Sequence, residues 1–403
     1  MLVDTFSSGS LLARAAADRC DLLHVRSRSR MPSEFALSLP ADVFRADLKF
    51  PGREDDVLRE LAAHDPVAVI CGSEFGVAVA DMLAARLALR GNDPALSTAR
   101  RDKSRMGEVL AAAGVPVAAQ LRATDPVQVL RWRAAEGLTD VVLKPLDSAG
   151  SEDVFFCTDE AEIATAFERI LGKDNLMMRV NRAVLAQERL EGTELVVNSV
   201  SRDGRHWFTD VWCSHKDWQD GRLIYDYEDL LAPDDPELNV VLPYVSDVLA
   251  ALGVAHGPAH TELILTPRGP RLLETAARPS GLANPAALTR CTGADQIGLT
   301  LDCFLGDGAE LAVRPKCYRR LRHARVVNLV ARREVLFDPQ VVTQALSMLP
   351  AFDSVRFRLP AGRSTRPTVD LNSSPGVVFL VSEDPQAVKK AYDVLREFEF
   401  TFY

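Results

Sequence analysis

Glu262 and Glu274 have a spacing that could support chemistry. They lie in HTELILTPRGPRLLETA, which predicts two strands joined by a tight turn at residues 267–270. On such a hairpin both carboxylates face the same side, where they would repel each other unless a cation joined them. Carboxylate oxygens favour magnesium, which completes its coordination shell with water and phosphate oxygens. Two solvent-exposed strand glutamates are the alternative interpretation.

Two further polar residues flank this pair of carboxylates. Arg278 follows Glu274 by four positions in ARPSG, and His260 precedes Glu262 by two. An arginine beside metal-binding carboxylates suits an anion that develops during a reaction, although a structural ion pair is the commoner role. His260 should face the same side as Glu262, because side chains alternate along a strand. It could contact substrate or act as a base, and a hydrogen-bonded core histidine fits equally well.

A third group of residues stands at the ends of two other strands. In VLKPLDSAGSEDV, Lys144 ends an apolar strand and a loop of small residues follows. A buried cation is unfavourable unless it is paired, so Lys144 needs an anionic partner. In QERLEGTELV, Gln187 and Glu188 end a strand, Leu190 follows at a hinge, and Glu194 comes after a glycine. Hinge groups of this kind can bind a planar base and a ribose, but taken by itself the stretch fits an ordinary strand–turn–strand better.

Four segments have to position these residues, in a chain of mixed α/β and α+β class. Residues 1–95 alternate short apolar runs with helical patterns, which predicts βαβ units and a parallel sheet. Residues 96–182 predict a compact α+β lobe, and residues 183–306 predict long strands with a hairpin turn at Asp203-Gly204. Residues 307–403 predict a small closing α+β lobe. The SSGS turn at residues 7–10 fits a plain strand-to-helix turn better than an anion site.

Composition limits the classes of function. The net charge of −9 argues against non-specific binding of nucleic acid. The seven cysteines are scattered without a C-x-x-C pair, which indicates reduced thiols in a cytoplasm and gives no zinc signature. The sequence begins without a basic, apolar leader and contains no long apolar run, so neither a secretory signal nor a membrane span is expected.

The order of these parts resembles the ATP-grasp superfamily: Lys103 in RRDKSRM, Lys144 with its bare loop, QERLEGTE, and then the hairpin with its arginine. The resemblance covers residues 1 to about 306 in order, and the closing lobe is compatible with it. It implies an ATP-grasp fold, with a Rossmann-like pre-ATP-grasp domain at residues 1–95, a small ATP-binding lobe at 96–182 and a large lobe with the metal site at 183–306. ATP and one or two Mg²⁺ ions would lie between the two lobes.

The resemblance also implies a role for each matching residue. The residues implied to bind ATP are Lys103, Lys144, Ser148, Gly150, Ser151, Gln187, Glu188, Leu190 and Glu194. The residues implied to bind magnesium are Glu262 and Glu274, with Arg278 and His260 as catalytic candidates. Many relatives carry an asparagine two residues after the second glutamate, whereas this sequence has Ala276. The second metal ion would then depend more on Glu274 and the phosphates.

Within that superfamily, the stretch from His260 to Gly281 looks like the L-amino-acid ligase branch. That similarity implies an enzyme that activates one amino acid as an acylphosphate, joins it to a second, and releases ADP and phosphate. Amino acids would be its partners, and a homodimer is common in the superfamily. The candidate substrate contacts are Trp212, Lys216, Ser280 and Gly281. Aromatic residues such as Trp212 and Tyr225 are more often packing, however, and Lys216 is more often a solvated charge.

Other functions stay open at the sequence level. The enzyme could join an amino acid to a different amine or acid, or it could be a carboxylase-type ATP-grasp enzyme, which would depend on bicarbonate. A non-catalytic nucleotide-binding subunit is a third interpretation, and Ala276 is the residue that favours it. The lysines, glutamates and arginine named above argue against it, because a decayed site would be expected to lose some of them.

Overall fold

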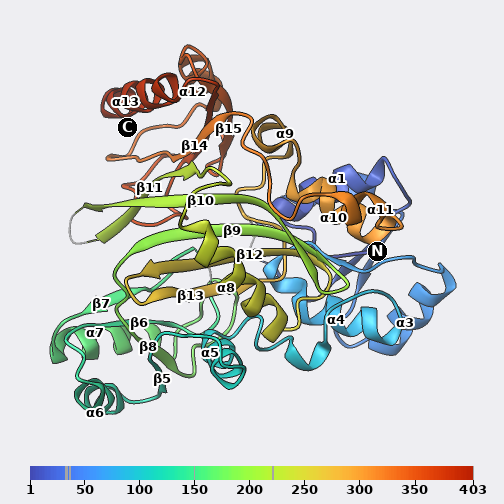
Figure 1. The fold of residues 1–403 in the computed structure, drawn as a ribbon, viewed down its shortest axis with the longest axis horizontal. Coiled ribbons are helices and arrows are strands. Elements are labelled where there is room, and N and C mark those ends of the chain that lie inside the picture. Colours follow the sequence, from blue (N-terminus) through green and yellow to red (C-terminus); the bar gives the residue numbers. More distant parts are fainter. Residues whose placement is uncertain (32–34, 36–37, 149, 220–221, 403) are drawn as a thin grey trace.

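The computed structural model describes residues 1–31, 35, 38–148, 150–219 and 222–402. Its described strands form a parallel sheet of four strands, an antiparallel sheet of four and an antiparallel sheet of eight. In Figure 1 the N-terminal unit is blue and lies at the right, the second sheet is green and lies at the lower left, and the long strands cross the middle. None of the helices in these ranges has the length and apolar character needed to cross a membrane.

The N-terminal unit confirms the predicted βαβ pattern. Its parallel strands lie in the order β3-β2-β1-β4. The strands are β1 (Leu2–Val3), β2 (Leu23–Arg26), β3 (Ala46–Lys49) and β4 (Ile70–Cys71), and the helices are α1 (Ser8–Ala17), α3 (Glu54–Ala63) and α4 (Val77–Arg86). The short helices η1 (Ala41–Val43), η2 (Glu74–Gly76) and η3 (Pro94–Leu96) occupy the connections. The apolar strands are buried because helices cover both faces of such a sheet.

The second lobe is an antiparallel sheet in the order β5-β8-β6-β7. Its strands are β5 (Gln120–Ala123), β6 (Val141–Pro145), β7 (Phe155–Cys157) and β8 (Val184–Glu188), and its helices are α5 (Lys103–Ala112), α6 (Pro126–Glu136) and α7 (Glu160–Ile170). Asp102 caps α5 by accepting a hydrogen bond from the backbone N–H of Arg105. This cap fixes Lys103 as the first residue of the helix, at the edge of the lobe.

The eight-stranded sheet has the order β13-β12-β9-β10-β11-β14-β16-β15. Its first five strands in sequence are β9 (Thr193–Arg202), β10 (Arg205–Gln219), β11 (Arg222–Leu230), β12 (Gly257–Thr266) and β13 (Gly269–Ala276). The predicted turn at Asp203-Gly204 is present, and both residues have positive φ (51° and 74°), as a tight hairpin turn of this kind requires. The helices α8 (Leu238–Ala251), α9 (Pro285–Thr292) and α10 (Gln296–Leu305) belong to the same region.

The C-terminal segment extends this sheet instead of forming a sheet of its own. Strand β14 (His323–Asn328) pairs with β11, and β16 (Gly376–Ser382) and β15 (Phe352–Phe357) follow it to the edge. The helices of the segment are α11 (Ala309–Val313), α12 (Pro339–Leu346) and α13 (Pro385–Phe402). A cluster that includes Val378, Leu380, Leu395 and Leu346 packs α12 and α13 on one face of these strands. The opposite face is left for the site described below.

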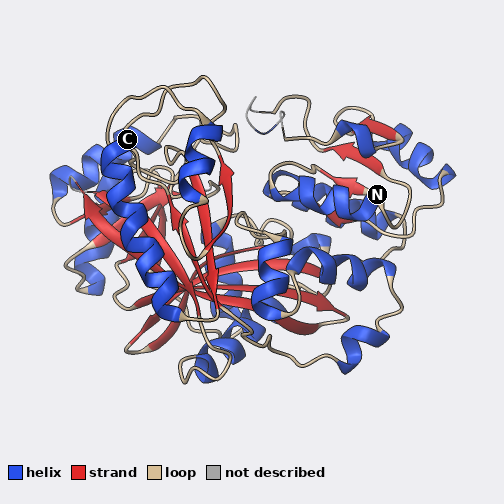
Figure 2. Ribbon diagram, turned by 90° about the horizontal axis from the view of Figure 1, so that it is seen from above, coloured by secondary structure: helices blue, strands red, loops and turns tan. Residues whose placement is uncertain are grey.

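A buried ion pair joins the N-terminal unit to the rest of the chain. The guanidinium of Arg100 is fully buried and donates to the carboxylate of Asp81 (2.6 Å) and to the backbone oxygen of Leu252 at the end of α8 (2.7 Å). Removing either charge would leave the other buried without a partner. Seen from above (Figure 2), the N-terminal unit lies to one side of the long strands.

Candidate active site

A cleft of about 890 Å³ is lined by residues from all four segments of the chain. The predicted site residues that line it are Lys103, Lys144, Ser148, Gly150, Ser151, Gln187, Glu188, Leu190, Glu194, Lys216, His260, Glu262, Glu274, Arg278 and Gly281. Ala149, which lies in the same loop, is outside the described residues. Residues that are far apart in the sequence therefore meet at one concave surface, as a ligand site requires.

The acidic wall of the cleft is the β12–β13 hairpin. Glu262 and Glu274 are directly paired across the two strands, so their side chains share a face as predicted. His260 also faces this side, and its Nε2 lies 3.1 Å from Oε1 of Glu262. Burial alone would raise the pKa of Glu262, but the hydrogen bond and charge of His260, together with the charges of Lys216 and Arg278, outweigh it and lower that pKa to about 2. Ala276 lies directly opposite His260. Position 276 is the one at which the resemblance would lead us to expect an asparagine.

The basic wall comes from the second lobe. The ammonium group of Lys144 donates to Oε1 of Gln187 (2.9 Å) and forms no ion pair with any carboxylate in the described residues. Burial, and then the charge of Lys103, lower the pKa of Lys144 to about 8. Lys103 forms an ion pair with Glu274 and also donates to the backbone oxygen of Ser148 (3.2 Å). That ion pair raises the pKa of Lys103 despite its burial.

These charges fit a polyphosphate and magnesium. Lys144 is a buried cation without an anion, which is the arrangement expected of a phosphate site before its ligand binds. Within the described residues, no group of three or more His, Cys, Asp and Glu side chains is arranged to hold a metal ion. Magnesium needs only one or two carboxylates when phosphate oxygens complete its shell. Glu262 and Glu274 supply that number at one place.

The strand end at QERLEGTE lies beside this basic wall. Both carboxylate oxygens of Glu188 have partners, Oε1 with the backbone N–H of Ala119 (2.9 Å) and Oε2 with Arg268 (2.7 Å). Its backbone N–H also donates to the backbone oxygen of Ala119 (2.9 Å), so neither its carboxylate nor its N–H is free for the hinge role that the resemblance implies. Glu194 pairs with Lys216 (2.7 Å). Burial raises the pKa of Glu194, and Lys216 partly offsets that rise.

The loop of small residues closes against two other parts of the chain. The hydroxyl groups of Ser151 and Tyr225 lie 2.7 Å apart. Gly150 has a φ of 68°, and a β-carbon there would lie 3.2 Å from the side-chain nitrogen of Asn372. A side chain at this position would therefore strain the backbone and crowd the C-terminal segment. Glycine keeps the loop thin where it covers the cleft.

Arg278 connects the hairpin to the N-terminal unit. Its Nε donates to Oε2 of Glu74 in η2 (3.1 Å), and its Nη1 donates to the backbone oxygen of Pro279 (3.1 Å). Sequence reasoning did not single out Glu74, although it lies in GSEFG directly after a buried strand, where polar residues often serve a site. The remaining Nη2 of Arg278 is available to an anion in the cleft.

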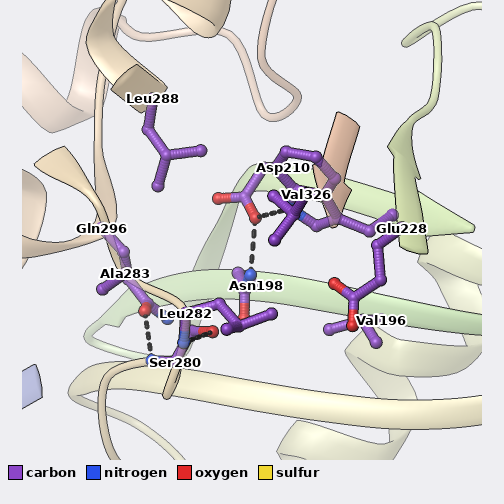
Figure 3. A pocket seen from close by; sticks show the side chains of 11 residues that line it. Val196, Asn198, Asp210, Glu228, Ser280, Leu282, Ala283, Leu288, Gln296 and Val326 are labelled. Atoms are coloured by element: carbon purple, nitrogen blue, oxygen red, sulfur yellow. Dashed lines mark hydrogen bonds between the residues drawn. The ribbon is translucent and has the colours of Figure 1, made fainter. Parts of the chain in front are cut away.

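Two predicted substrate contacts have to be corrected. Trp212 and Ser280 do not line the cleft but a separate cavity of about 10 Å³, room for about one water molecule (Figure 3). Trp212 is buried in the apolar core, where its indole N–H donates to Oδ1 of Asp210 (2.5 Å). The backbone N–H of Ser280 donates to the side chain of Gln296 (2.8 Å). Both residues therefore have structural roles that their sequence context did not reveal.

A buried chain of hydrogen bonds leads from this small cavity to the hairpin. The side-chain nitrogen of Asn198 donates to Asp210 (2.5 Å), and its oxygen lies 2.8 Å from Nδ1 of His260. Figure 3 shows the Asn198–Asp210 contact beside Glu228. Burial raises the pKa of Asp210. This chain of hydrogen bonds fixes the plane of the imidazole ring of His260, which contacts Glu262. His260 is therefore a positioning residue for that carboxylate.

Comparison with known proteins first defines the class. This chain belongs to the ATP-grasp family of ligases, enzymes that form C–N bonds and release ADP. Along its whole length it is 32% identical to dapdiamide A synthase of Enterobacter agglomerans, of which it covers 96%. No protein-family model matches the chain.

Solved structures share the fold at low sequence identity. L-amino acid ligase from Bacillus licheniformis superposes with a TM-score of 0.76 at 17% identity, over 98% of this chain and 96% of the other. Carboxyaminoimidazole ribonucleotide synthase from Aspergillus clavatus, solved with ATP, gives a TM-score of 0.72 at 14% identity, over 100% and 98% of the two chains. The fold predicted from the order of motifs is confirmed.

Proposed function

We propose that this protein joins the carboxylate of one amino acid to the amino group of a second, with ATP as the phosphoryl donor and ADP and phosphate as products. The observation that carries the proposal is the cleft in which Lys103 and Lys144 face Glu262 and Glu274, with Arg278 beside them. The whole-length similarity to dapdiamide A synthase and the shared fold of L-amino acid ligase support an amide product over a carboxylation.

Glu262 and Glu274 would hold the magnesium, as one or two ions. When bound, magnesium neutralises phosphate oxygens and so makes the transfer of the phosphoryl group to a carboxylate easier. The pKa of Glu262 is lowered to about 2, so this ligand stays ionised at any physiological pH. His260 contributes by orienting that carboxylate through the 3.1 Å contact.

The lysines would meet the phosphate oxygens. For this, Lys144 exchanges its hydrogen bond to Gln187 for phosphate, and Lys103 shares its charge between Glu274 and the nucleotide. The loop at Ser148, Gly150 and Ser151 covers the phosphates and excludes water, because an acylphosphate that met water would be hydrolysed. Gln187, Leu190 and Glu194, which line the same cleft, would hold the base and the ribose.

Amide formation then takes place on the substrate side. The amino nitrogen of the second amino acid, in its neutral form, attacks the acyl carbon, and the C–O bond to phosphate breaks with its electron pair. Phosphate then leaves with the proton that the nitrogen gives up. Arg278 would stabilise the oxyanion that forms on the acyl oxygen, an effect of about 3 kcal/mol for one well-placed donor. Its ion pair with Glu74 holds the guanidinium in place. Lys216 and Gly281 line the same cleft and are the substrate contacts that stay in the proposal.

The proposal also concerns the segments of the chain, the cellular compartment and the assembly. We infer that residues 1–95, 96–182, 183–306 and 307–403 act as the four functional segments, although the last shares the large sheet. Seven unpaired cysteines are compatible with a cytoplasmic enzyme. A homodimer is the assembly we propose, by analogy with the family.

The test is phosphate release from ATP and magnesium with a matrix of amino-acid pairs. Release that requires two amino acids, with a new peptide in the mass spectrum, supports the proposal. Release with one amino acid and a different amine would indicate a broader amide ligase, and release that requires bicarbonate would indicate a carboxylase. The Glu274→Gln variant, assayed at a magnesium concentration that limits its activity, serves as the low-activity control.

A further inference from the structure

Three arginines of the C-terminal segment line the cleft: Arg356, Arg358 and Arg366. Arg356 lies near the end of β15 and Arg358 follows that strand, so the two side chains leave the backbone on the same side. In the described part of the chain, none of the three forms an ion pair with a carboxylate. Unpaired guanidinium groups in a cleft are suited to an anion that comes from outside the protein.

Neutral oxygen atoms hold the first two guanidinium groups in place. Arg356 donates to the backbone oxygens of Gly281 and of Ala283 (3.2 Å for the latter). Arg358 donates to the side-chain oxygen of Asn328 (3.3 Å). These contacts orient the guanidinium groups without neutralising them. Burial lowers the pKa of Arg356, and burial, then the charge of Arg356, lower the pKa of Arg358, which the charge of Glu228 only partly offsets.

Glu228 shares the cleft face of the sheet with Arg356. Glu228 on β11 is paired with Val326 on β14. Two residues further along β14, Asn328 is paired with Val377 on β16. Val377 is paired in turn with Arg356 on β15. Paired residues, and residues two apart on a strand, lie on the same face of a sheet. Glu228 is 7% exposed and lines both the cleft and the small cavity. Figure 3 shows its carboxyl group without a hydrogen bond to the other lining residues.

The carboxyl group of Glu228 needs a cation as much as the arginines need an anion. Burial, and then the charges of Glu262 and Glu194, raise its pKa to about 8. Its charge in turn acts to raise the pKa of Arg358, although the two groups form no ion pair. Without a cation beside it the carboxyl group of Glu228 is therefore mostly protonated at pH 7, and an ammonium group in the cleft would favour its ionised form. An α-amino acid carries an ammonium group and a carboxylate only a few bond lengths apart.

We propose that Glu228, Arg356 and Arg358 form the receptor for the amino acid that supplies the amine, with its carboxylate at the two arginines and its ammonium group at Glu228. This inference rests on the proposed function and names the chemical class of the second substrate. An amine without a neighbouring carboxylate would leave the arginines without an anion and bind weakly.

The position of the receptor agrees with the order of the reaction. Arg356 contacts the carbonyl of Gly281, three residues after Arg278, so the receptor lies beside the group assigned to the oxyanion. Glu274 and Arg356 lie on the two edge strands of the large sheet, β13 and β15. The metal carboxylates and the receptor thus come from different edge strands of the sheet, and Arg278, which follows β13, connects them through the contact of Arg356 with Gly281.

The test separates the two halves of the reaction. Hydroxylamine, which has no carboxylate, traps the acylphosphate as a hydroxamate, and each of the twenty L-amino acids is compared with its α-amide as amine donor. The acid is the one that gives the fastest hydroxamate formation. We expect the wild type to prefer amino acids over amides at least tenfold in kcat/KM. Arg356→Gln and Arg358→Gln should raise the KM of the amine donor at least tenfold and abolish this preference, while hydroxamate formation stays within twofold.

Three further variants complete the comparison. Glu228→Gln should also raise the KM of the amine donor and leave hydroxamate formation intact, and Arg358→Lys should restore part of the preference. Arg363→Gln, on an exposed residue of the same segment that does not line the cleft, is the matched control and should behave as wild type.

The outcomes distinguish the inference from the proposed function. Absence of any ATP-dependent hydroxamate would refute the proposed function and the receptor with it. Normal hydroxamate formation with an unchanged preference for amino acids in both arginine variants would overturn the receptor alone. A rise in the KM of the acid, with that of the amine donor unchanged, would also overturn it, because the arginines would then hold the first substrate.

Discussion

Replacing Lys144 with methionine should make the ligand-free protein more stable. The pKa of Lys144 is lowered from 10.5 to about 8, and a difference of about 2.5 units corresponds to about 3 kcal/mol of cost for keeping the charged form folded at pH 7. The variant loses the hydrogen bond to Gln187, which is worth about 1 kcal/mol. The net gain in the free energy of unfolding is therefore about 2 kcal/mol.

The pH dependence of this gain has a definite sign. Below pH 8 the lysine is protonated in both the folded and the unfolded chain, so the full cost is present. Between pH 8 and 10.5 the folded chain has released a proton that the unfolded chain retains, so the cost falls as the pH rises. The advantage of Lys144→Met should accordingly shrink at pH 9.5, by about half or more of the charge cost.

Nucleotide binding should change in the opposite direction. Loss of a charged contact to phosphate costs about 1.5–3 kcal/mol. A non-hydrolysable ATP analogue with magnesium, at a concentration that stabilises the wild type by about 3 kcal/mol, should then stabilise the variant by about 1.5 kcal/mol or less. Urea unfolding with and without the analogue measures both effects, and Lys173→Met, on an exposed lysine outside the cleft, is the control. A variant that is less stable than wild type without ligand, yet equally stabilised by the analogue, would refute the reasoning.

Three further substitutions test separate parts of the site. Arg278→Ala should leave the nucleotide Kd, measured by titration, within about threefold while kcat falls by a factor of about 100–1,000, and an equal loss of nucleotide binding would contradict its role. Glu274→Gln should raise the magnesium concentration needed for half-maximal activity at least tenfold, with the exposed Glu383→Gln as control; an unchanged requirement would place the metal elsewhere. Trp212→Phe should lower the free energy of unfolding by about 1–3 kcal/mol, because Asp210 loses a buried donor, without changing any KM; a changed KM would restore Trp212 as a substrate contact.

Local patterns predicted the hairpin and its turn, but not the register that brings its two carboxylates together. The tight turn alone would pair Glu262 with Leu273, and a β-bulge between Glu262 and Leu263 shifts the pairing by one residue, so that Glu262 lies opposite Glu274. The position of His260 follows from the alternation of side chains along the strand. The order of motifs then identified the fold, because each motif stands at the end of a different element of one family architecture.

What could not be predicted depends on contacts between distant parts of the chain. Alternation places Trp212 on the cleft face of β10, but only the fold shows that this part of the face is covered by core residues. Pairing of β14 with β11 joins residues about 100 positions apart, so the closing segment could not be assigned to the large sheet. The same pairing brings Arg356 and Glu228 onto one face of the sheet, so their common position could not be predicted either. Glu74 reaches Arg278 from another sheet altogether.

Transfer of an oxygen atom tests the central claim most directly. If the acid is activated by phosphoryl transfer to its carboxylate, an amino acid labelled with ¹⁸O in that carboxylate must leave one labelled oxygen in the phosphate released on amide formation. The account predicts phosphate heavier by one ¹⁸O, in an amount equal to the ADP formed. Unlabelled phosphate accompanying a normal yield of amide would contradict it.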